Sequence, residues 1–581
     1  MNRREFAKLS ALSLAATALP ARAQTVSGTM IPVLKRGFDN SNSGCNLLET
    51  TLTQANVAAQ GIKLIGRMGM QGDLRGCEAQ PLIVPSVACG DGLTRDLVIL
   101  CSMNNTVWAF DPNSFDPTTQ TFDLIWEVKI ATPVRGSSAI DSYNINEFWG
   151  ILSTPVIDMD TKRIYLVAWS SVDGSQAKAA HFVYVLNLGD GSWVCNPVPL
   201  SALKSNGETY SSMLRKQRGS LLMTNVGGVK TVFIPASTVN EFSAGATGWV
   251  IAFDVATNTV TAALATSAGQ GAGIWNSGAS MIADAAGYIY ASTGNGGFDG
   301  IQNFGESIIK LQYTHSPASL AIVDRWSPFT DKGRVETPEQ EDEGWYDADV
   351  GSSGLLLVPQ YNSIVAAGKD SIGFVSNTRN LGETTLASFI NAPANYGKLR
   401  SAPLWLGYYP GNGVNAAPQD SSNLDFQYQG NAHEMHSTPV SYQRADGTVI
   451  VFVWASNSQL RAWSLSSAGQ LTFLAQGNET ASANQPGDPG GFMCISSNGS
   501  KTGTPLLFAC IPLGDAGSGI GGGRFLVYNA EAFANGVIKL LWDSAAWGIN
   551  YSHNKYCPPV VSNGKVLVGT YDDQVLVFAL A

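Results

Sequence analysis

Residues 219–237, GSLLMTNVGGVKTVFIPAS, and 248–260, GWVIAFDVATNTV, contain the pattern that decides the fold. Short apolar segments, some of them alternating with polar residues, are separated by turns rich in Gly, Asn and Asp. Such segments indicate antiparallel β-strands rather than helices. The unit consists of an apolar strand, a turn, an alternating strand, and a strand that ends in an aliphatic-aromatic-Asp turn.

The same unit recurs along the chain with imperfect spacing. Repeats of about 40–60 residues with about four strands each are typical of a β-propeller, which closes into a ring and leaves few exposed strand edges. We count eight copies, or seven if two of them merge, and the last copy ends after three strands. The stretch GIKLIGRM at residues 61–68 is well placed to supply the missing outer strand. The sequence therefore predicts an all-β, eight-bladed propeller of four-stranded antiparallel blades, closed by an N-terminal strand.

The first 23 residues are expected to be an export signal rather than part of the fold. A pair of arginines at 3–4 precedes a short apolar run, and ARA at 21–23 forms a small-x-small cleavage site. The NRREFAK string resembles a twin-arginine export signal, and the apolar run is too short to span a bilayer. We expect residues 24–581 to form one propeller domain, periplasmic or secreted, without a membrane span and with a long loop insertion at about 392–430.

Composition narrows the classes of partner. The 61 glycines and 14 tryptophans suit many strands and turns, and the net charge of −10 argues against nucleic acid, which requires clustered Lys and Arg. The eight cysteines permit disulfides in an oxidising compartment, and Cys89 with Cys101, which flank one turn, is a candidate pair. The chain has no C-x-x-C-H motif, so we expect no covalently attached haem.

Residues 269–299, GQGAGIWNSGASMIADAAGYIYASTGNGGFD, combine Trp275 with Asn295 between two glycines. This stretch resembles the part of the pyrroloquinoline quinone (PQQ) dehydrogenases in which a Trp forms the floor under the quinone and a TGN asparagine ligates the metal. The phrases VWAFDPNS and VIAFDVATN resemble the blade-end turns of these proteins, with Asp111 and Asp254 as caps. The ordinary alternative is a β-hairpin with a core Trp and an Asn that tolerates left-handed backbone geometry.

Four further places match the same family in chain order. In GCEA at 76–79, Glu78 corresponds to a glutamate that contacts the quinone, and in NEF at 240–242, Glu241 corresponds to a metal ligand. In WYDAD at 345–349, the resemblance gives Asp347 the roles of general base and metal ligand, and Asp349 that of a second metal ligand. In GKD at 368–370, Lys369 takes the place of a cation beside the quinone oxygens, where it would stabilise the reduced cofactor.

Two weaker matches and two departures complete the comparison. Thr238 could reach the quinone edge with its hydroxyl, and His436 stands where an asparagine usually contacts the cofactor. The family's adjacent Cys-Cys pair is missing, and the arginine usually near it is not identifiable. For each matched residue the ordinary alternative is a solvated loop or strand residue, and Asp347 and Asp349 lie in a stretch that is acidic throughout.

The resemblance implies a dehydrogenase that oxidises an alcohol or sugar hydroxyl with PQQ and a Ca²⁺ or lanthanide ion. The ion would be held by Glu241, Asn295, Asp347 and Asp349, with Asp347 taking the hydroxyl proton. Electrons would pass to a separate soluble carrier in the periplasm. The competing hypothesis is a non-catalytic PQQ-like propeller that serves as a periplasmic or extracellular binding or assembly scaffold.

Overall fold

The computed structural model describes residues 29–73, 75–143, 145–241, 243–327, 349–369, 372–382, 403–405, 434–482, 489–517 and 519–581. The predicted signal at 1–23, most of the predicted insertion at 392–430, and Asp347 lie outside these residues. Among the helices that are described, none has the length and hydrophobicity required to cross a membrane.

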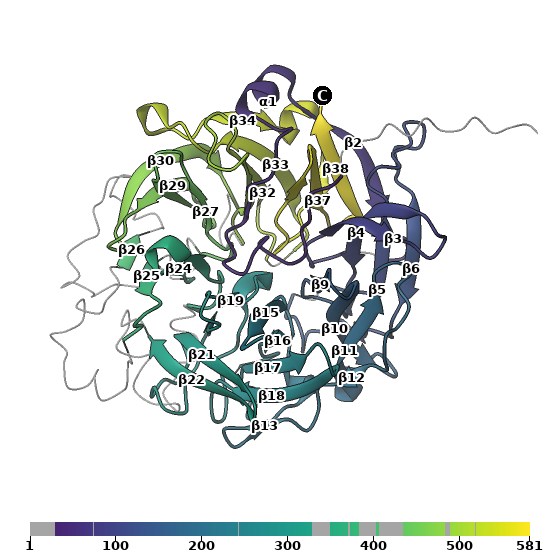
Figure 1. The fold of residues 1–581 in the computed structure, drawn as a ribbon, viewed down its shortest axis with the longest axis vertical. Coiled ribbons are helices and arrows are strands. Elements are labelled where there is room, and N and C mark those ends of the chain that lie inside the picture. Colours follow the sequence, from purple (N-terminus) through teal and green to yellow (C-terminus); the bar gives the residue numbers. More distant parts are fainter. Residues whose placement is uncertain are drawn as a thin grey trace, which may run out of the picture.

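Eight blades of four antiparallel strands surround a central axis, as predicted (Figure 1). In each blade the first strand lies nearest the axis, and the strands then follow one another outward in chain order, except at the ring closure. Blade one consists of β3 (Leu82–Ala88), β4 (Thr94–Cys101), β5 (Thr106–Phe110) and β6 (Leu124–Lys129), and blade two of β9 (Val156–Asp158), β10 (Arg163–Ser171), β11 (Ala179–Asn187) and β12 (Val198–Pro199). Blade three consists of β15 (Leu222–Val226), β16 (Val229–Ala236), β17 (Trp249–Asp254) and β18 (Thr259–Ala265), and blade four of β19 (Ile282–Ala283), β20 (Ile289–Ser292), β21 (Ile308–His315) and β22 (Ala318–Trp326).

The second half of the ring repeats this arrangement. Blade five consists of β23 (Leu356–Val358), β24 (Ser363–Ala367), β25 (Ile372–Asn377) and β26 (Pro403–Trp405), and blade six of β27 (Val440–Gln443), β28 (Val449–Val453), β29 (Gln459–Leu465) and β30 (Leu471–Thr480). Blade seven consists of β31 (Phe492–Ser496), β32 (Leu506–Pro512), β33 (Gly522–Asn529) and β34 (Leu540–Asp543), and blade eight of β36 (Val560–Ser562), β37 (Lys565–Gly569), β38 (Gln574–Leu580) and β2 (Ile62–Gly69). Blade seven is extended by β1 (Cys45–Asn46) and β35 (Tyr551–Ser552).

Among the described residues, several short elements lie outside the eight blades. They are the helix α1 (Gln54–Gln60), the ribbons β7 (Val134–Arg135) with β8 (Phe148–Trp149) and β13 (Lys204–Ser205) with β14 (Glu208–Thr209), and the 3-10 turns η1 (Gln176–Lys178), η2 (Ser212–Leu214), η3 (Asn276–Gly278), η5 (Pro359–Tyr361), η7 (Ala534–Gly536) and η8 (Ser544–Trp547).

The core lies between neighbouring blades rather than inside one of them. Every residue of β17 is buried, because the blade on each side covers one of its faces. Tyr165 of the second blade packs against Phe253 of the third at 6.2 Å between ring centroids, and Phe233 of the third packs against Tyr313 of the fourth at 5.5 Å. This two-sided burial explains why the strands are near-continuous apolar runs.

The predicted closure of the ring is confirmed. Strand β2 pairs antiparallel with β38, from Ile62 opposite Leu580 to Gly69 opposite Gln574. The N-terminal strand thus completes, as its outermost strand, the blade whose other three strands come from the C-terminus (Figure 1).

An element that the sequence analysis missed occupies the centre of the ring. Residues 30–46, which we call the hub segment, run along the first strands of the blades near the axis (Figure 1). Backbone pairs join it to six blades, through Val33–Ile83, Leu34–Ile157, Asn40–Ala283, Ser41–Leu357, Ser43–Ser441 and Cys45–Ile495. The side chains of Asn40 and Asn46 reach the remaining two, at Met223 and Val561. The hub segment therefore contacts all eight blades.

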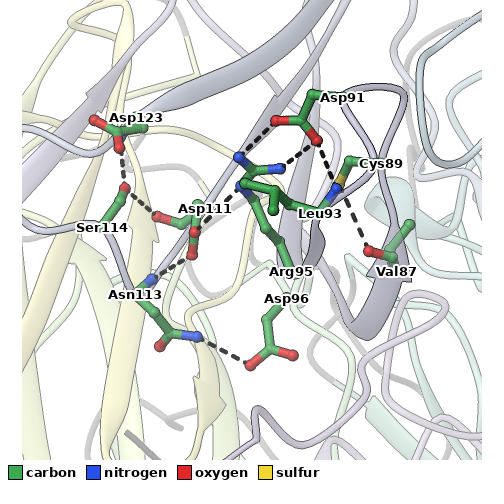
Figure 2. A network of polar contacts seen from close by, with 10 residues as sticks. All are labelled: Val87, Cys89, Asp91, Leu93, Arg95, Asp96, Asp111, Asn113, Ser114 and Asp123. Atoms are coloured by element: carbon green, nitrogen blue, oxygen red, sulfur yellow. Dashed lines mark hydrogen bonds and ion pairs between the residues drawn. The ribbon is translucent and has the colours of Figure 1, made fainter. Parts of the chain in front are cut away.

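Aspartates cap the blade-end turns, as expected from the sequence, and Figure 2 shows the turn at Asp111. Asp111 accepts the backbone N–H of Asn113 at 2.8 Å, and its own carbonyl accepts the hydroxyl of Ser114 at 2.8 Å. Asp254 accepts the N–H of Thr257 at 2.8 Å. A short polar side chain that bonds to the backbone two or three residues on is the usual way to stabilise such a turn.

The predicted disulfide between Cys89 and Cys101 is wrong, and all eight cysteines are free. The N–H of Cys89 bonds to the carbonyl of Leu93, so Cys89 lies beside the start of β4, whereas Cys101 is the last residue of that strand. At about 3.3 Å per residue the two are separated by roughly 25 Å. A disulfide requires Cα atoms within about 7 Å. Both thiols instead pack into the core between the first two blades.

Candidate functional site

A cavity of about 560 Å³ lies at the hub, at the end of the ring where the first strands begin. Its wall is built from segments that precede the first strands of six blades and from loops that follow the second strands of three. Its lining includes Trp149, Lys216, Arg218, Glu241, Trp275, Asp349, Lys369, His436, Lys555 and Tyr556. Residues far apart in the chain thus meet around one space.

Trp275 is half-buried and lines the cavity from the segment before β19. It is followed by two residues with left-handed backbone, Asn276 at φ 50° and Ser277 at φ 40°, and then by a glycine at φ 81°. Asn276 is held by its N–H to the carbonyl of Gly351 at 2.8 Å and by the hydroxyl of Ser292 at 3.1 Å. Consecutive left-handed residues other than glycine are costly and occur where surrounding contacts impose them, often at functional sites.

Three of the predicted metal ligands lie together beside this indole, and we call Glu241, Asn295 and Asp349 the acidic corner. The side-chain amide of Asn295 donates to Glu241 Oε1 at 2.8 Å, and the backbone N–H of Asn295 donates to Asp349 Oδ1 at 2.9 Å. The glycine of the TGN stretch permits this contact, because a Cβ on Gly294 would lie 2.0 Å from Asp349 Oδ1 and 3.2 Å from Trp275 Cδ1. The acidic corner and the indole are therefore direct neighbours.

A cation balances the acidic corner. Lys369 Nζ lies 2.8 Å from Asp349 Oδ2, so this predicted cofactor-binding lysine contacts a predicted metal ligand. Behind the pair, the carboxylate of Glu306 accepts the backbone N–H groups of Asp349 at 3.1 Å and of Val350 at 2.7 Å. These bonds fix the backbone that carries Asp349, which has a left-handed φ of 33°.

His436 lines the cavity. Its Nε2 lies 2.6 Å from Glu434 Oε2, and its Nδ1 lies 3.4 Å from the hydroxyl of Ser277. All three residues face the same space. The imidazole is therefore oriented by a carboxylate on one side and connected to the tryptophan segment on the other.

Glu78 and Thr238 lie close to the cavity but are not part of its wall. Glu78 is buried and forms an ion pair with Arg218, while the hydroxyl of Tyr571 donates to it at 2.6 Å and the amide of Asn146 at 3.2 Å. Arg218 lines the cavity, so Glu78 supports the wall from behind. The buried hydroxyl of Thr238 has no hydrogen-bond partner among the described residues.

Sequence reasoning missed the basic residues of the cavity. The segment RKQR at 215–218 places Lys216 and Arg218 in the wall just before β15. Three cations within four residues, directly ahead of an apolar strand, are the signal that could have found them. Burial lowers the pKa of Lys216 to about 8 and that of Arg215 to about 10.

The residues present suit a hard cation and a flat anionic molecule. Two carboxylates and one amide oxygen are ligands that Ca²⁺ and lanthanide-type ions prefer. In the present arrangement Asn295 points its NH₂ group at Glu241, and rotating the amide by 180° would present oxygen instead. Among the described residues no group of three or more His, Cys, Asp or Glu side chains could hold a metal ion, and the fourth predicted ligand, Asp347, lies outside these residues.

Comparisons with known proteins establish the fold and nothing narrower. No family model matches the chain, and no curated protein matches it. The quinohemoprotein alcohol dehydrogenase of Comamonas testosteroni is similar in structure, with a TM-score of 0.54 and 13% identity over 94% of this chain and 80% of that one. A europium-containing methanol dehydrogenase gives 0.47 and 14% identity over 94% and 98%. Sqt1 of Saccharomyces cerevisiae gives 0.43 and 10% over 89% and 99%. A WD40 propeller domain matches as well, at a TM-score of 0.34.

Proposed function

We propose that this chain is a quinoprotein-type dehydrogenase that oxidises an alcohol or sugar hydroxyl. The observation that carries the proposal is the acidic corner, which lies directly beside the indole of Trp275 in the hub cavity with Lys369 bound to Asp349. A site for a redox cofactor and a cation requires such a combination of flat surface, hard ligands and neutralising charge. PQQ would supply a two-electron acceptor, and a Ca²⁺ or lanthanide ion would supply a Lewis acid.

The chain's own residues would divide the remaining tasks. Trp275 would orient a flat ring by stacking and exclude water from one of its faces. Glu241, Asn295 and Asp349 would hold the cation. The ammonium of Lys369 would offset the repulsion between the carboxylates of Asp349 and Glu241. Asp347 stays the predicted base for the hydroxyl proton, and a soluble periplasmic carrier stays the predicted electron acceptor.

A non-catalytic binding propeller is the second candidate, and one observation favours it. Glu78, which the resemblance assigns to the quinone edge, is already engaged by Arg218, Tyr571 and Asn146. A scaffold would retain such a structural ion pair without any cofactor.

Binding of PQQ to the purified protein tests the proposal. We expect uptake that requires Ca²⁺ or La³⁺, followed by alcohol-dependent reduction of a dye. Glu241→Gln should weaken the ion dependence, whereas Asp160→Asn, at a carboxylate that is 84% exposed, should not. If the wild-type protein takes up no quinone with either ion, the dehydrogenase proposal fails and the binding propeller remains.

A further inference from the structure

One part of the cavity wall is basic and aromatic. Lys216 and Arg218 come from the segment before β15, and Lys555 comes from the segment before β36. Nζ of Lys216 lies 4.6 Å from the ring centroid of Trp149, and Cζ of Arg218 lies 4.5 Å from that of Tyr556. We call these five residues the basic wall.

Two of the three cations have protein partners. Arg218 forms the ion pair with Glu78, and Lys555 donates to the carbonyl of Gly517 at 3.4 Å. Lys216 differs, because within the described part of the chain no hydrogen bond or ion pair reaches its ammonium group, although only 9% of the residue is exposed. A buried ammonium without an anion destabilises a fold unless a ligand supplies one.

The acid that acts electrostatically on Lys216 is occupied elsewhere. Asp141 lines the same cavity and opposes the lowering of the Lys216 pKa, but it is not in ion-pair contact with the lysine. Its carboxylate instead accepts the backbone N–H groups of Tyr143 and Ile145, both at 3.2 Å. Lys555 adds a second positive charge near Lys216. Asp141 therefore does not supply the anion that the ammonium of Lys216 lacks.

We propose that Lys216 anchors an anion-binding subsite in the hub cavity, and that the group bound there is a carboxylate of a small organic molecule. Trp275 connects this subsite to the acidic corner. Lys216 Nζ lies 5.9 Å from the indole centroid, and the Cδ1 edge of the same indole lies beside Gly294 and Asp349. A molecule of a few carbon atoms could therefore place its carboxylate at Lys216 and its other end at the acidic corner.

Given the proposed function, on which this step rests, the substrate class is the hydroxy carboxylic acids. The carboxylate would bind at Lys216, and the hydroxyl would lie at the acidic corner. The carboxylates of the quinone are a second source of the same chemistry. The experiment must therefore separate substrate from cofactor.

The test measures binding without turnover. Calorimetric titration of the protein with lactate, in the absence of quinone, is compared with titration by 1,2-propanediol, which replaces the carboxylate by a neutral group. We expect lactate to bind more tightly than the diol. Its affinity should fall about tenfold to hundredfold in Lys216→Gln and be largely kept in Lys216→Arg, because a charge-assisted hydrogen bond is lost in one variant and retained in the other. Cooperative urea unfolding of each variant confirms that it is folded.

A second titration, with PQQ and Ca²⁺, identifies the source of the carboxylate. If Lys216→Gln weakens the binding of lactate but not that of PQQ, the subsite belongs to the substrate. If the variant weakens the binding of PQQ but not that of lactate, Lys216 still binds a carboxylate, but hydroxy acids are not the substrate class. The inference fails if folded Lys216→Gln binds both molecules as the wild type does, or if the wild type binds neither. If the protein binds lactate through Lys216 but oxidises no alcohol, the proposed anion subsite stands and the proposed dehydrogenase activity fails.

Discussion

Replacing Lys216 by methionine should stabilise the fold, although the residue lines the hub cavity. Burial lowers the pKa of Lys216 from 10.5 to about 8 because the charged form loses its contact with water; the charge of Asp141 opposes this effect and that of Lys555 adds to it. Methionine retains an unbranched apolar stem and removes the charge. The substitution thus isolates the cost of burying an ammonium that has no protein anion.

The expected gain is about 1–3 kcal/mol at pH 7. A pKa that falls from 10.5 to about 8 corresponds to about 3 kcal/mol, at roughly 1.4 kcal/mol per pKa unit. The contacts of the ammonium with the faces of Trp149 and Trp275 are lost in the variant, and they are worth about 0.5–2 kcal/mol. The desolvation cost is the larger of the two effects, so the variant should be the more stable protein.

The gain should depend on pH with a definite sign. Because the pKa of Lys216 is lower in the folded chain than in the unfolded chain, the folded chain binds fewer protons between about pH 8 and pH 10.5. The wild type therefore gains stability from this residue as the pH rises through that window. The advantage of Lys216→Met should be full below about pH 8 and nearly gone by pH 10.5, where the lysine of the folded chain is neutral and that of the unfolded chain is half protonated.

Urea unfolding followed by tryptophan fluorescence at pH 7 and pH 10.5 measures both effects. Lys63→Met, at an exposed lysine of β2, is the matched control and should change the free energy of unfolding by less than about 0.5 kcal/mol at either pH. The reasoning is refuted if Lys216→Met is no more stable than the wild type at pH 7. It is also refuted if the gain at pH 10.5 equals the gain at pH 7.

Further predictions concern the acidic corner, the hub segment and the thiols. Gly294→Ala should displace the carboxylate of Asp349 and lower the free energy of unfolding by about 2–4 kcal/mol, while Gly69→Ala, in open space, should be nearly neutral in the same urea titration. Arg36→Met removes the bond from the hub segment to the carbonyl of Tyr556 at 2.5 Å; leaving that carbonyl unsatisfied should cost about 1–3 kcal/mol, and unchanged urea midpoints would contradict a structural role for the hub segment. Because all eight cysteines are free, dithiothreitol should leave the melting temperature unchanged, and a clear drop would reveal a disulfide.

The blades could be predicted because their signal is local. In the third blade, the runs at 219–237 and 248–260 contain both the strand pattern and the turns that end it, and β15, β16 and β17 form within them. The closure by β2 was also predictable, because the last repeat lacks one strand and 61–68 has the pattern to fill it. The hub segment was not, because residues 30–46 have little strand pattern of their own and gain their order from contacts with eight separate blades.

The candidate site was predictable in its residue types and less so in its pairings. The resemblance pointed to Glu241, Asn295 and Asp349, and the fold brings them together. It also pointed to Glu78, which instead pairs with Arg218, 140 positions away. Such a pairing depends on which blade faces which across the hub, and no local pattern records it.

The amino-acid sequence by itself determined the architecture, because alternation, turn residues and repeat length act over a few positions and recur in every blade. Only the tertiary structure decided which charges meet and which are left without a partner. Arg36 and Tyr556 are 520 positions apart and in contact, and Lys216 becomes a buried cation because Trp149 and Trp275, from two other segments, cover it. The physical reason is that burial and pairing are properties of the closed ring. A charge that would be solvated in the unfolded chain loses its water when the eight blades meet around it. It then destabilises the fold and becomes able to bind an anion.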